Sequence, residues 1–290
     1  MLTCRSFARA GFLYALVLLM PQITGCEEEP QYRISVDTRR VVTFGFLPYA
    51  DRQRMKTLFD CLKGHLSQHL DAEIQFVLSP DFDMMGELML DKKLDLVWFT
   101  PAAYAKVGRR VGARILCKPI RRGQPWYRSE LVVGSGSTAQ EIKDLKGSRF
   151  AYVDKNSTSG FVMPNRQLAR AGFKDPLAFF SSVTFTNRHE DSLAGIAAGR
   201  FDAASVYEGA MEHVKPPLQP SDFRVLVTGP HIPNDPICVR PDLDPDLTEK
   251  IRRLFLQMHE MDSGREALVP IEKHEGITKF IPARDEEYDF

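Results

Sequence analysis

Apolar residues in the first half of the chain form short continuous runs that alternate with runs at helical spacing. Residues 41–47 predict a buried strand, and apolar positions at helical spacing over 55–66 predict the helix that follows it. A second strand over 74–78, a helix over 82–90 and a third strand over 94–99 continue the order. Alternation of this kind is typical of an α/β fold with a largely parallel sheet.

The alternation begins again after residue 136. Thr138 and Glu141 form a capping box that predicts a helix ending at Gly147. Strands and helices then alternate over 149–153, 160–171, 183–185, 190–198 and 201–206. Leu94–Trp98 and Phe201–Ser205 both follow a short helix, and we interpret this weak internal repeat as two similar lobes.

The C-terminal segment contains an amphipathic helix over 251–258, opened by Asp246 or Thr248, that needs an apolar surface to cover. We expect it to return to the first lobe. Loops that leave the carboxyl ends of parallel strands line the ligand crevice of α/β proteins. The loops in question are 47–50, 99–104, 154–160 and 206–210.

The first 26 residues predict export. A basic start and an apolar run over 11–20 precede Ile23–Cys26, which looks like a bacterial lipobox. We therefore expect a signal peptide over 1–25, a lipidated Cys26, and a tether over 26–39 that holds the protein at the periplasmic or extracytoplasmic face of a membrane. Cleavage near Gly25 with an unmodified Cys26 thiol stays open as the alternative.

Composition narrows the function classes. The chain has 290 residues, 43% of them hydrophobic, and 38 basic residues balance 38 acidic ones. This is enough apolar material for one large domain or two lobes, and the balanced charge excludes a nucleic-acid partner. No Cys/His spacing suits a metal, no cofactor motif is present, and His65 and His69 are expected on a solvated helix face.

Three cysteines remain after the signal region, namely Cys61, Cys117 and Cys238. Cys117 and Cys238 lie in apolar, strand-like runs, which favours buried free thiols. A disulfide between Cys117 and Cys238 stays open as the alternative.

Asn156–Gly160 carries three consecutive hydroxyls between a strand and a helix. A helix start presents unpaired N–H groups, so Ser157, Thr158 and Ser159 can complete an oxyanion site without a lysine or arginine. Ordinary helix capping is the alternative interpretation.

Three further polar residues are candidates. Asp235 lies between prolines, which restrict its backbone, and could also be a simple turn aspartate. His189 and Glu208 follow predicted strands and could be a cap and a surface charge. Together the three would place two carboxylates and an imidazole around one cleft. Tyr49, Phe99 and Thr100 lie in cleft-facing loops, whereas Trp98 is expected in the core.

Several of these motifs, in this order, resemble the substrate-binding proteins of phosphate/phosphite/phosphonate ABC transporters over residues 40–289. The motifs are Asp95–Pro101, Tyr127–Ser129, Asp154–Gly160, His189, Ile232–Pro236 and Val239–Pro241. The resemblance implies a type II periplasmic binding fold of two α/β lobes, each a mostly parallel sheet flanked by helices. Lobe 1 would comprise 40–130 plus 237–290 and lobe 2 would comprise 131–236, with hinge crossovers near 129–133 and 233–238.

The resemblance also implies residue roles. Ser157, Thr158 and Ser159 would hold anion oxygens, His189 and Tyr127 would donate hydrogen bonds, and Glu208 and Asp235 would accept a ligand hydrogen. Phe82 stands where many relatives have tyrosine, which would remove a hydroxyl from the pocket wall.

The expected function is that of a monomeric solute-binding lipoprotein that passes a phosphorus oxyanion to an ABC permease and ATPase. An ionised carboxylate only accepts hydrogen bonds, so the ligand must bring a proton, which sulfate lacks. The alternatives are a sensor lipoprotein that presents a bound oxyanion to a membrane kinase, and an enzyme on the same scaffold.

Overall fold

The computed structural model describes residues 40–47, 52–173 and 175–289. The predicted signal peptide, Cys26, the tether and Tyr49 lie outside the described residues. Inside these ranges, none of the helices combines the length and the apolar character needed to cross a bilayer.

The first sheet has six strands in the order β11-β4-β10-β3-β1-β2. Its strands are β1 (Arg40–Phe46), β2 (Ala72–Leu78), β3 (Leu96–Trp98), β4 (Arg114–Arg121), β10 (Ile237–Val239) and β11 (Ile277–Ile281). β1 pairs in parallel with β2 and β3, whereas β10 and β11 pair antiparallel with their neighbours. The C-terminal segment thus returns to the first sheet, as predicted, and brings antiparallel strands into it.

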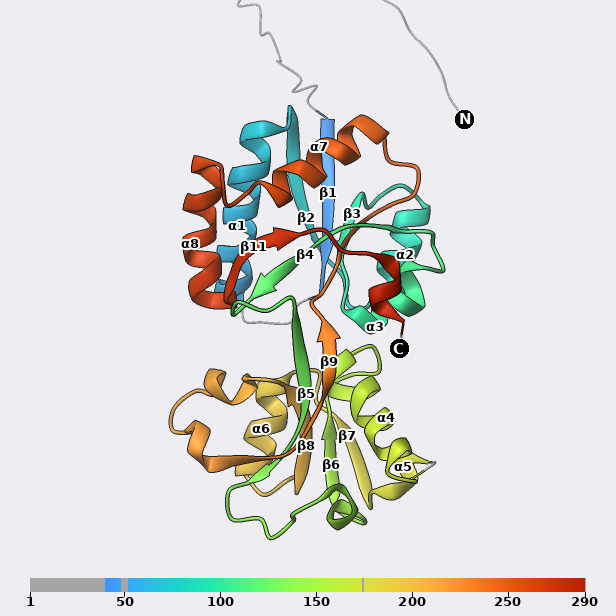
Figure 1. Cartoon of the computed structure of the whole chain (residues 1–290), viewed down its shortest axis with the longest axis vertical. Helices are drawn as coiled ribbons and strands as arrows, with labels where there is room; N and C mark the ends of the chain where they lie inside the picture. The colour runs from blue at the N-terminus through green and yellow to red at the C-terminus, as the bar shows by residue number, and fades with distance from the viewer. Residues whose placement is uncertain (1–39, 48–51, 174, 290) are drawn as a thin grey trace, which may run out of the picture. The chain divides into compact units, whose positions relative to one another are not determined.

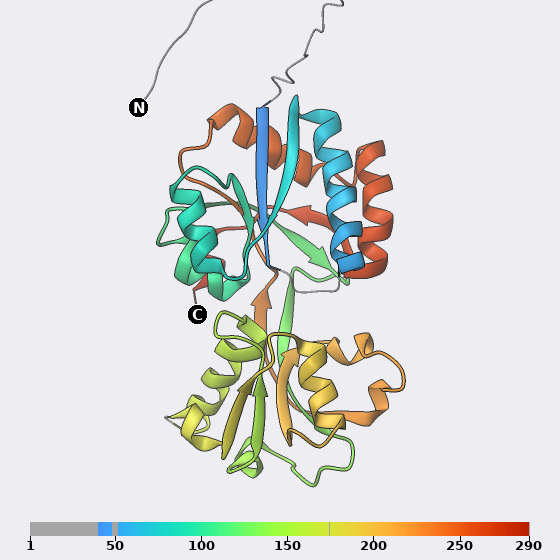
Figure 2. The same ribbon diagram turned by 180° about the vertical axis from the view of Figure 1, so that it is seen from behind.

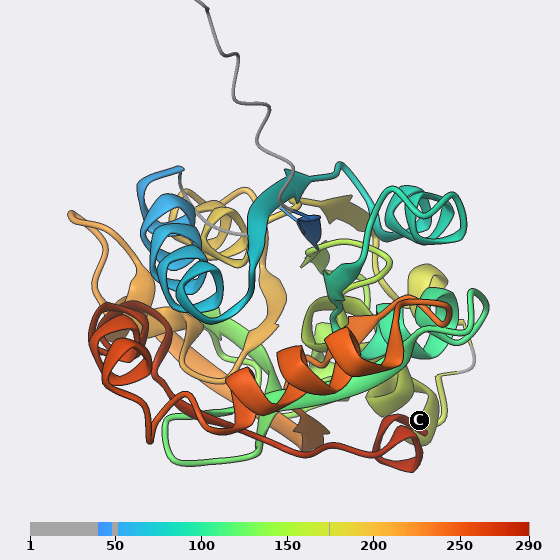
Figure 3. The same cartoon turned by 90° about the horizontal axis from the view of Figure 1, so that it is seen from above.

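Helices cover both faces of this sheet, and we call the whole unit lobe 1 (Figures 1 and 3). One face is covered by α1 (Arg52–His69), α7 (Pro245–Leu256) and α8 (Asp262–Glu275), and the other by α2 (Phe82–Leu90), α3 (Pro101–Ala103), η1 (Tyr104–Gly108) and η6 (Asp285–Tyr288). Alternate strand residues feed the two cores, because neighbouring side chains of a strand point to opposite faces. Leu96 lies in the core under α1, and Val97 lies in the core under α2.

The second sheet has five strands in the order β7-β6-β8-β5-β9. Its strands are β5 (Trp126–Gly134), β6 (Arg149–Tyr152), β7 (Ser182–Phe185), β8 (Ala203–Tyr207) and β9 (Phe223–Pro233). Figure 2 shows α6 (His189–Ala197) on one side of it and α4 (Met163–Arg170) with α5 (Pro176–Phe179) on the other; we call this unit lobe 2. The antiparallel pair β5 and β9 connects the two lobes (Figure 1).

Two predicted helix starts are wrong. The helix expected to end at Gly147 is only the 3-10 turn η2 (Ile142–Leu145), because the Asp144 carboxylate accepts the backbone N–H groups of Gln140 and Glu141 and closes a tight turn. The helix α7 begins at Pro245, with Asp244 accepting from the Leu247 N–H at 2.9 Å. Proline fits this first helical position because it has no N–H to satisfy.

The expectation that His65 and His69 lie on a solvated face of α1 is also wrong for His65, which is 1% exposed. Its Nδ1 lies 3.0 Å from the Ser263 hydroxyl, and its Nε2 lies 3.1 Å from the Leu254 carbonyl. A buried imidazole with both nitrogens satisfied is a packing group between helices. Burial lowers its pKa.

The three described cysteines are free thiols. Cys117 pairs in register with Ile237, so both face the core under α1. Cys238, the next residue after Ile237, faces the opposite core. The two sulfurs therefore lie on opposite faces of one sheet, and the prediction of buried free thiols is confirmed for this pair.

Candidate ligand-binding site

The hydroxyl-rich segment Asn156–Gly160, which we call the anion loop, joins β6 to the helical turn η3 (Thr158–Val162). Ser157 caps this turn, and its hydroxyl accepts from the Gly160 N–H at 3.0 Å. A Cβ on Gly160 would lie 2.5 Å from Val153 Cγ2, so only glycine allows this close approach. The tight turn therefore depends on glycine at this position.

Two serines, one on β5 and one on β8, anchor the anion loop through hydrogen bonds to its backbone. The Ser129 hydroxyl donates to the Ser159 carbonyl at 2.7 Å, and the Ser205 hydroxyl donates to the Gly160 carbonyl at 2.7 Å. Both serines are fully buried. These two anchors were not predicted, because a serine in an apolar strand gives no signal of a partner 30 or 45 residues away.

The loop hydroxyls themselves are buried, with Ser157 at 6%, Thr158 at 1% and Ser159 at 3% exposure. Tyr127, on β5, makes side-chain hydrogen bonds with Thr158 and Ser159. Burial, together with the charge of Asp235, raises the pKa of Tyr127, so its phenol stays protonated and can donate. The structure therefore brings together four predicted hydroxyl-bearing residues.

His189 begins α6 at the same edge of the second sheet. The preceding Thr186 and Asn187 N–H groups donate to the carbonyls of Tyr152 and Val153, the last residues before the anion-loop region. The His189 ring packs edge-on against Tyr207, with ring centroids 4.7 Å apart. Burial lowers the pKa of His189 to about 3, so the ring is neutral.

The Nδ1 atom of His189 is buried and has no hydrogen-bond partner among the described residues. A neutral imidazole offers one donor and one acceptor. Leaving a buried ring nitrogen unpaired costs roughly 1 to 3 kcal/mol. A ligand group that pairs with this nitrogen would recover that cost.

Asp235 lies between β9 and β10 and is held by its own backbone. Its carbonyl accepts from the Trp98 indole N–H at 3.0 Å. The preceding Asn234 is 2% exposed and donates its side-chain amide to the carbonyls of Pro119 and Gln124. Asn234 was not predicted as an anchor, although it lies in the Ile232–Pro236 motif.

The Asp235 carboxyl is half-buried, and burial raises its pKa to about 6, with Glu275 adding to the rise and Arg121 opposing it. Its negative charge acts on the Tyr127 phenol, which places the two side chains near each other. A carboxyl with a pKa near 6 exchanges a proton easily in the neutral range.

Glu208 follows β8 and is exposed, with its N–H donating to the Arg128 carbonyl at 2.9 Å. Its negative charge acts on the carboxyl of Glu130 on β5, which is 7% exposed. Burial first, and Glu208 second, raise the pKa of Glu130 to about 7. The structure thus pairs Glu208 with a second carboxylate, Glu130, that sequence analysis missed.

Two predicted wall residues have other surroundings. Phe82 is 2% exposed and lies in the core of lobe 1, with its ring centroid 5.5 Å from that of Phe99, which is itself fully buried. Both rings face this core, so the Phe82 side chain does not line an open pocket wall. Trp98 is 9% exposed and belongs to the core, as predicted.

Thr100 lies at the start of α3, and its hydroxyl donates to the Asn156 carbonyl of the anion loop at 2.9 Å. This contact crosses from lobe 1 to lobe 2. The Ala102 N–H also crosses, donating to the Thr158 hydroxyl at 2.9 Å. Thr100 therefore contacts the anion loop, and its hydroxyl bonds to protein.

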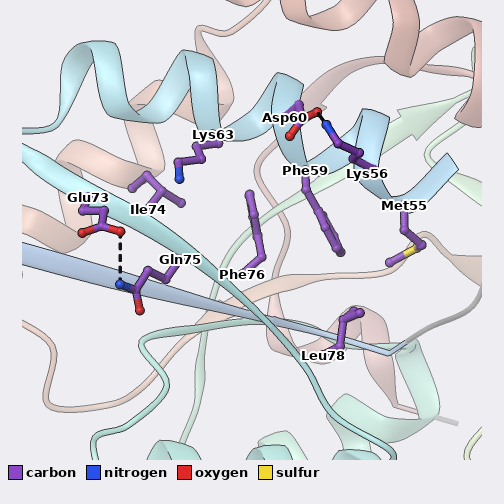
Figure 4. Close-up of a pocket in the computed structure, with 10 residues that line it drawn as sticks. All are labelled: Met55, Lys56, Phe59, Asp60, Lys63, Glu73, Ile74, Gln75, Phe76 and Leu78. Atoms are coloured by element: carbon purple, nitrogen blue, oxygen red, sulfur yellow. Dashed lines mark hydrogen bonds and ion pairs between the residues drawn. The ribbon is translucent and has the colours of Figure 1, made fainter. Parts of the chain in front are cut away.

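A separate cavity of about 820 Å³ lies between α1 and β2 (Figure 4). Its walls include the stacked rings of Phe59 and Phe76, 4.6 Å apart, and the charged pair Lys56 and Asp60. None of the candidate ligand residues lines it. The candidate ligand site therefore stays at the anion loop and does not include this hollow.

The anion loop offers hydroxyl groups, Tyr127 links two of them to the Asp235 carboxyl, and the neutral imidazole of His189 comes from the adjoining start of α6. Among the described residues, no group of His, Cys, Asp and Glu side chains is arranged to hold a metal ion. Charge-assisted hydrogen bonds contribute roughly 1.5 to 3 kcal/mol each, so three or four would support micromolar binding of a small anion. A ligand that also carries a proton would satisfy a carboxylate.

The sequence matches the family described as ABC transporter, phosphonate, periplasmic substrate-binding protein, over residues 44–288. It is 24% identical to the phosphate-import protein PhnD of Mycolicibacterium smegmatis, over 95% of this chain and 91% of that protein. It is 23% identical to the phosphonates-binding periplasmic protein of Escherichia coli, over 76% of this chain and 67% of that protein. Its fold resembles that of PhnD1 from Prochlorococcus marinus in complex with methylphosphonate, with a TM-score of 0.74, 22% identity, and coverage of 86% of this chain and 95% of that one.

Proposed function

The chain belongs to the family of periplasmic substrate-binding proteins of phosphonate ABC transporters, and from this premise we propose that it captures a phosphonate, phosphite or phosphate at the anion loop. It is a transport component and not an enzyme, and its family places it outside the cytoplasm. Ser157, Thr158, Ser159, Tyr127 and His189 supply donors to the anion.

The observation that carries the proposal is the burial of three consecutive hydroxyls beside a carboxyl whose pKa is raised to about 6. Hydroxyl and N–H donors hold oxygens without adding a full positive charge. Asp235, and Glu208 where it reaches the ligand, accept a ligand hydrogen. Phosphorus oxyanions suit this pairing because their second ionisation falls close to neutral pH, so a form that still carries a proton is available there.

Relatives support the ligand class by what their names record. The Mycolicibacterium smegmatis protein is named for phosphate import, and the Prochlorococcus marinus protein was solved with methylphosphonate. We carry both ligands to this chain as candidates. Tyr49 stays a candidate for a wall beyond the anion.

We further propose that Cys26 is lipidated and tethers a monomeric binding domain to the membrane, where an ABC permease and ATPase receive the ligand. The support is the Ile23–Cys26 lipobox pattern after an apolar run. Mass spectrometry of the membrane fraction tests it through a diacylglycerol adduct on Cys26. A peptide that begins at another residue, or a plain Cys26, would refute it.

Calorimetry of the mature protein with methylphosphonate, phosphite, phosphate and sulfate tests the ligand assignment. We expect micromolar or tighter binding of at least one phosphorus oxyanion and none of sulfate. Ser157→Ala should weaken that binding at least tenfold, about 1.4 kcal/mol, because it removes a ligand donor. Equal affinity for sulfate, or unchanged affinity in Ser157→Ala, would contradict the assignment.

A further inference from the structure

Lobe 1 touches the anion loop directly through hydrogen bonds from the start of α3 and through Lys106 on η1, whose Nζ donates to the Asn156 Oδ1 at 3.4 Å. The Thr100 hydroxyl donates to the Asn156 carbonyl, and the Ala102 N–H donates to the Thr158 hydroxyl, each at 2.9 Å. Both acceptors belong to the loop assigned to the ligand, and both donors come from the start of α3. We call these two bonds the latch.

The Thr100 hydroxyl gives its only proton to a protein partner. It accepts from the Ala103 N–H at 3.2 Å, as the N-cap of α3, and donates its single proton to Asn156. A threonine hydroxyl has one proton to give, so in this arrangement none is left for a ligand oxygen. The structure thus points to a role for Thr100 that differs from direct ligand contact.

The Thr158 hydroxyl is in the complementary position. It accepts from the Ala102 N–H at 2.9 Å and also bonds to the Tyr127 phenol of the candidate site. The same hydroxyl therefore belongs both to the latch and to the anion site. A change in the position of Thr158 would affect both at once.

A second contact between the lobes does not reach the anion loop. Arg122, whose N–H is bonded to the Gly276 carbonyl in lobe 1, pairs with Glu212 at 3.0 Å and with His213 at 2.9 Å in lobe 2. The Arg122 and Glu212 side chains are 40% and 65% exposed. Exposed ion pairs contribute little to stability. This contact can hold the lobes together, but it cannot sense the shape of the anion loop.

We propose that Thr100 is a positioning residue that couples anion capture to lobe closure. A bound anion fixes the loop hydroxyls, and the fixed loop presents Asn156 and Thr158 to the start of α3. The two latch bonds then favour the closed arrangement, and by linkage the closed arrangement favours the anion. The proposal rests on the proposed function, because it requires a ligand at the anion loop.

Two substitutions at Thr100 separate its hydroxyl from its shape. Thr100→Val keeps the shape and removes the hydroxyl, whereas Thr100→Ser keeps the hydroxyl. The mature protein and both variants are titrated with methylphosphonate, phosphite and inorganic phosphate by calorimetry. Small-angle scattering then measures the radius of gyration with and without a saturating ligand.

We expect Thr100→Val to bind about tenfold more weakly and to compact less on ligand addition than the wild type. Thr100→Ser should restore both properties to within about twofold. Asp244→Ala is the matched control, because it removes an N-cap from α7 in the same lobe without touching the anion loop. It should lower the unfolding temperature as Thr100→Val does, but leave affinity and compaction unchanged.

Three results would overturn the proposal. If the wild type binds and Thr100→Val binds and compacts equally well, the latch has no role. If Asp244→Ala loses as much affinity as Thr100→Val, the effect follows from stability alone. If the wild type binds none of the three probes, the proposed function fails, and the coupling fails with it.

Discussion

Replacing Asp235 with asparagine should stabilise the unliganded protein and weaken the ligand at the same time. The folded state raises the pKa of this carboxyl from 3.8 to about 6, chiefly through burial. Each tenfold change in proton affinity corresponds to about 1.4 kcal/mol, which sets an upper bound of about 3 kcal/mol on the cost of ionised Asp235. Because the side chain is only half-buried, solvent screening reduces the expected cost to about 1 to 2 kcal/mol.

The pH dependence follows from the sign of the shift. Between pH 3.8 and about 6 the folded state binds the proton more tightly than the unfolded state, so the wild type loses stability as pH rises through this window. Asp235→Asn has no such proton to lose. Its advantage should be about 1 to 2 kcal/mol at pH 7.5 and should vanish below pH 4.

Urea unfolding of both proteins at pH 4, 5.5 and 7.5 measures this difference, and calorimetry at pH 7.5 measures ligand affinity. We expect affinity to fall at least tenfold in Asp235→Asn, because a charge-assisted bond becomes a neutral one. A variant that is less stable than the wild type at pH 7.5, or a stability difference that does not change with pH, would refute the reasoning.

Two other substitutions test the site from different sides. Gly160→Ala places a Cβ 2.5 Å from Val153 Cγ2 and 2.7 Å from Ser157 Oγ. We therefore expect the unfolding free energy to fall by about 1 to 3 kcal/mol and the ligand affinity to fall at least tenfold. A variant with wild-type stability and affinity would show that the turn tolerates a side chain. Glu130→Gln removes a carboxyl whose pKa is raised to about 7 by burial and by the charge of Glu208. The wild type should lose stability as pH rises from 4.5 to 7, and this variant should lose less over the same range. Parallel stability curves for the two proteins in urea between pH 4.5 and 8 would contradict this account of Glu130.

Sequence patterns predicted the elements that depend on local signals. Strand β1 and helices α1 and α2 follow from apolar spacing alone. The bounds of α2 are the predicted ones, and those of β1 and α1 differ by a few residues. The cap of α7 was misplaced because several polar residues near Pro245 could cap it, and only the structure shows that Asp244 does. The direction of strands such as β10 depends on partners far along the chain, so local periodicity could not reveal it.

In the candidate site too, local signals predicted some residues, whereas contacts far along the chain decided others. Ser157–Gly160 was predicted because hydroxyls and glycine stand next to one another at a helix start. Glu130 was missed because its burial depends on the packing of β5 against β8. Thr100 was assigned to the ligand because it lies in a cleft-facing loop, and local sequence could not show its acceptor, Asn156, 56 residues away. A local pattern shows which groups a residue carries, but the fold decides which of them remain available.

The placement of Cys117 and Cys238 on opposite sides of one sheet has a consequence for export. In an oxidising compartment, thiols in reach of each other become linked, and a linked pair would tie β4 to β10 across the layer that separates their sulfurs. Once the protein is folded, that layer of backbone separates the two sulfurs. Cross-linking between these two thiols is therefore confined to the interval before lobe 1 has folded.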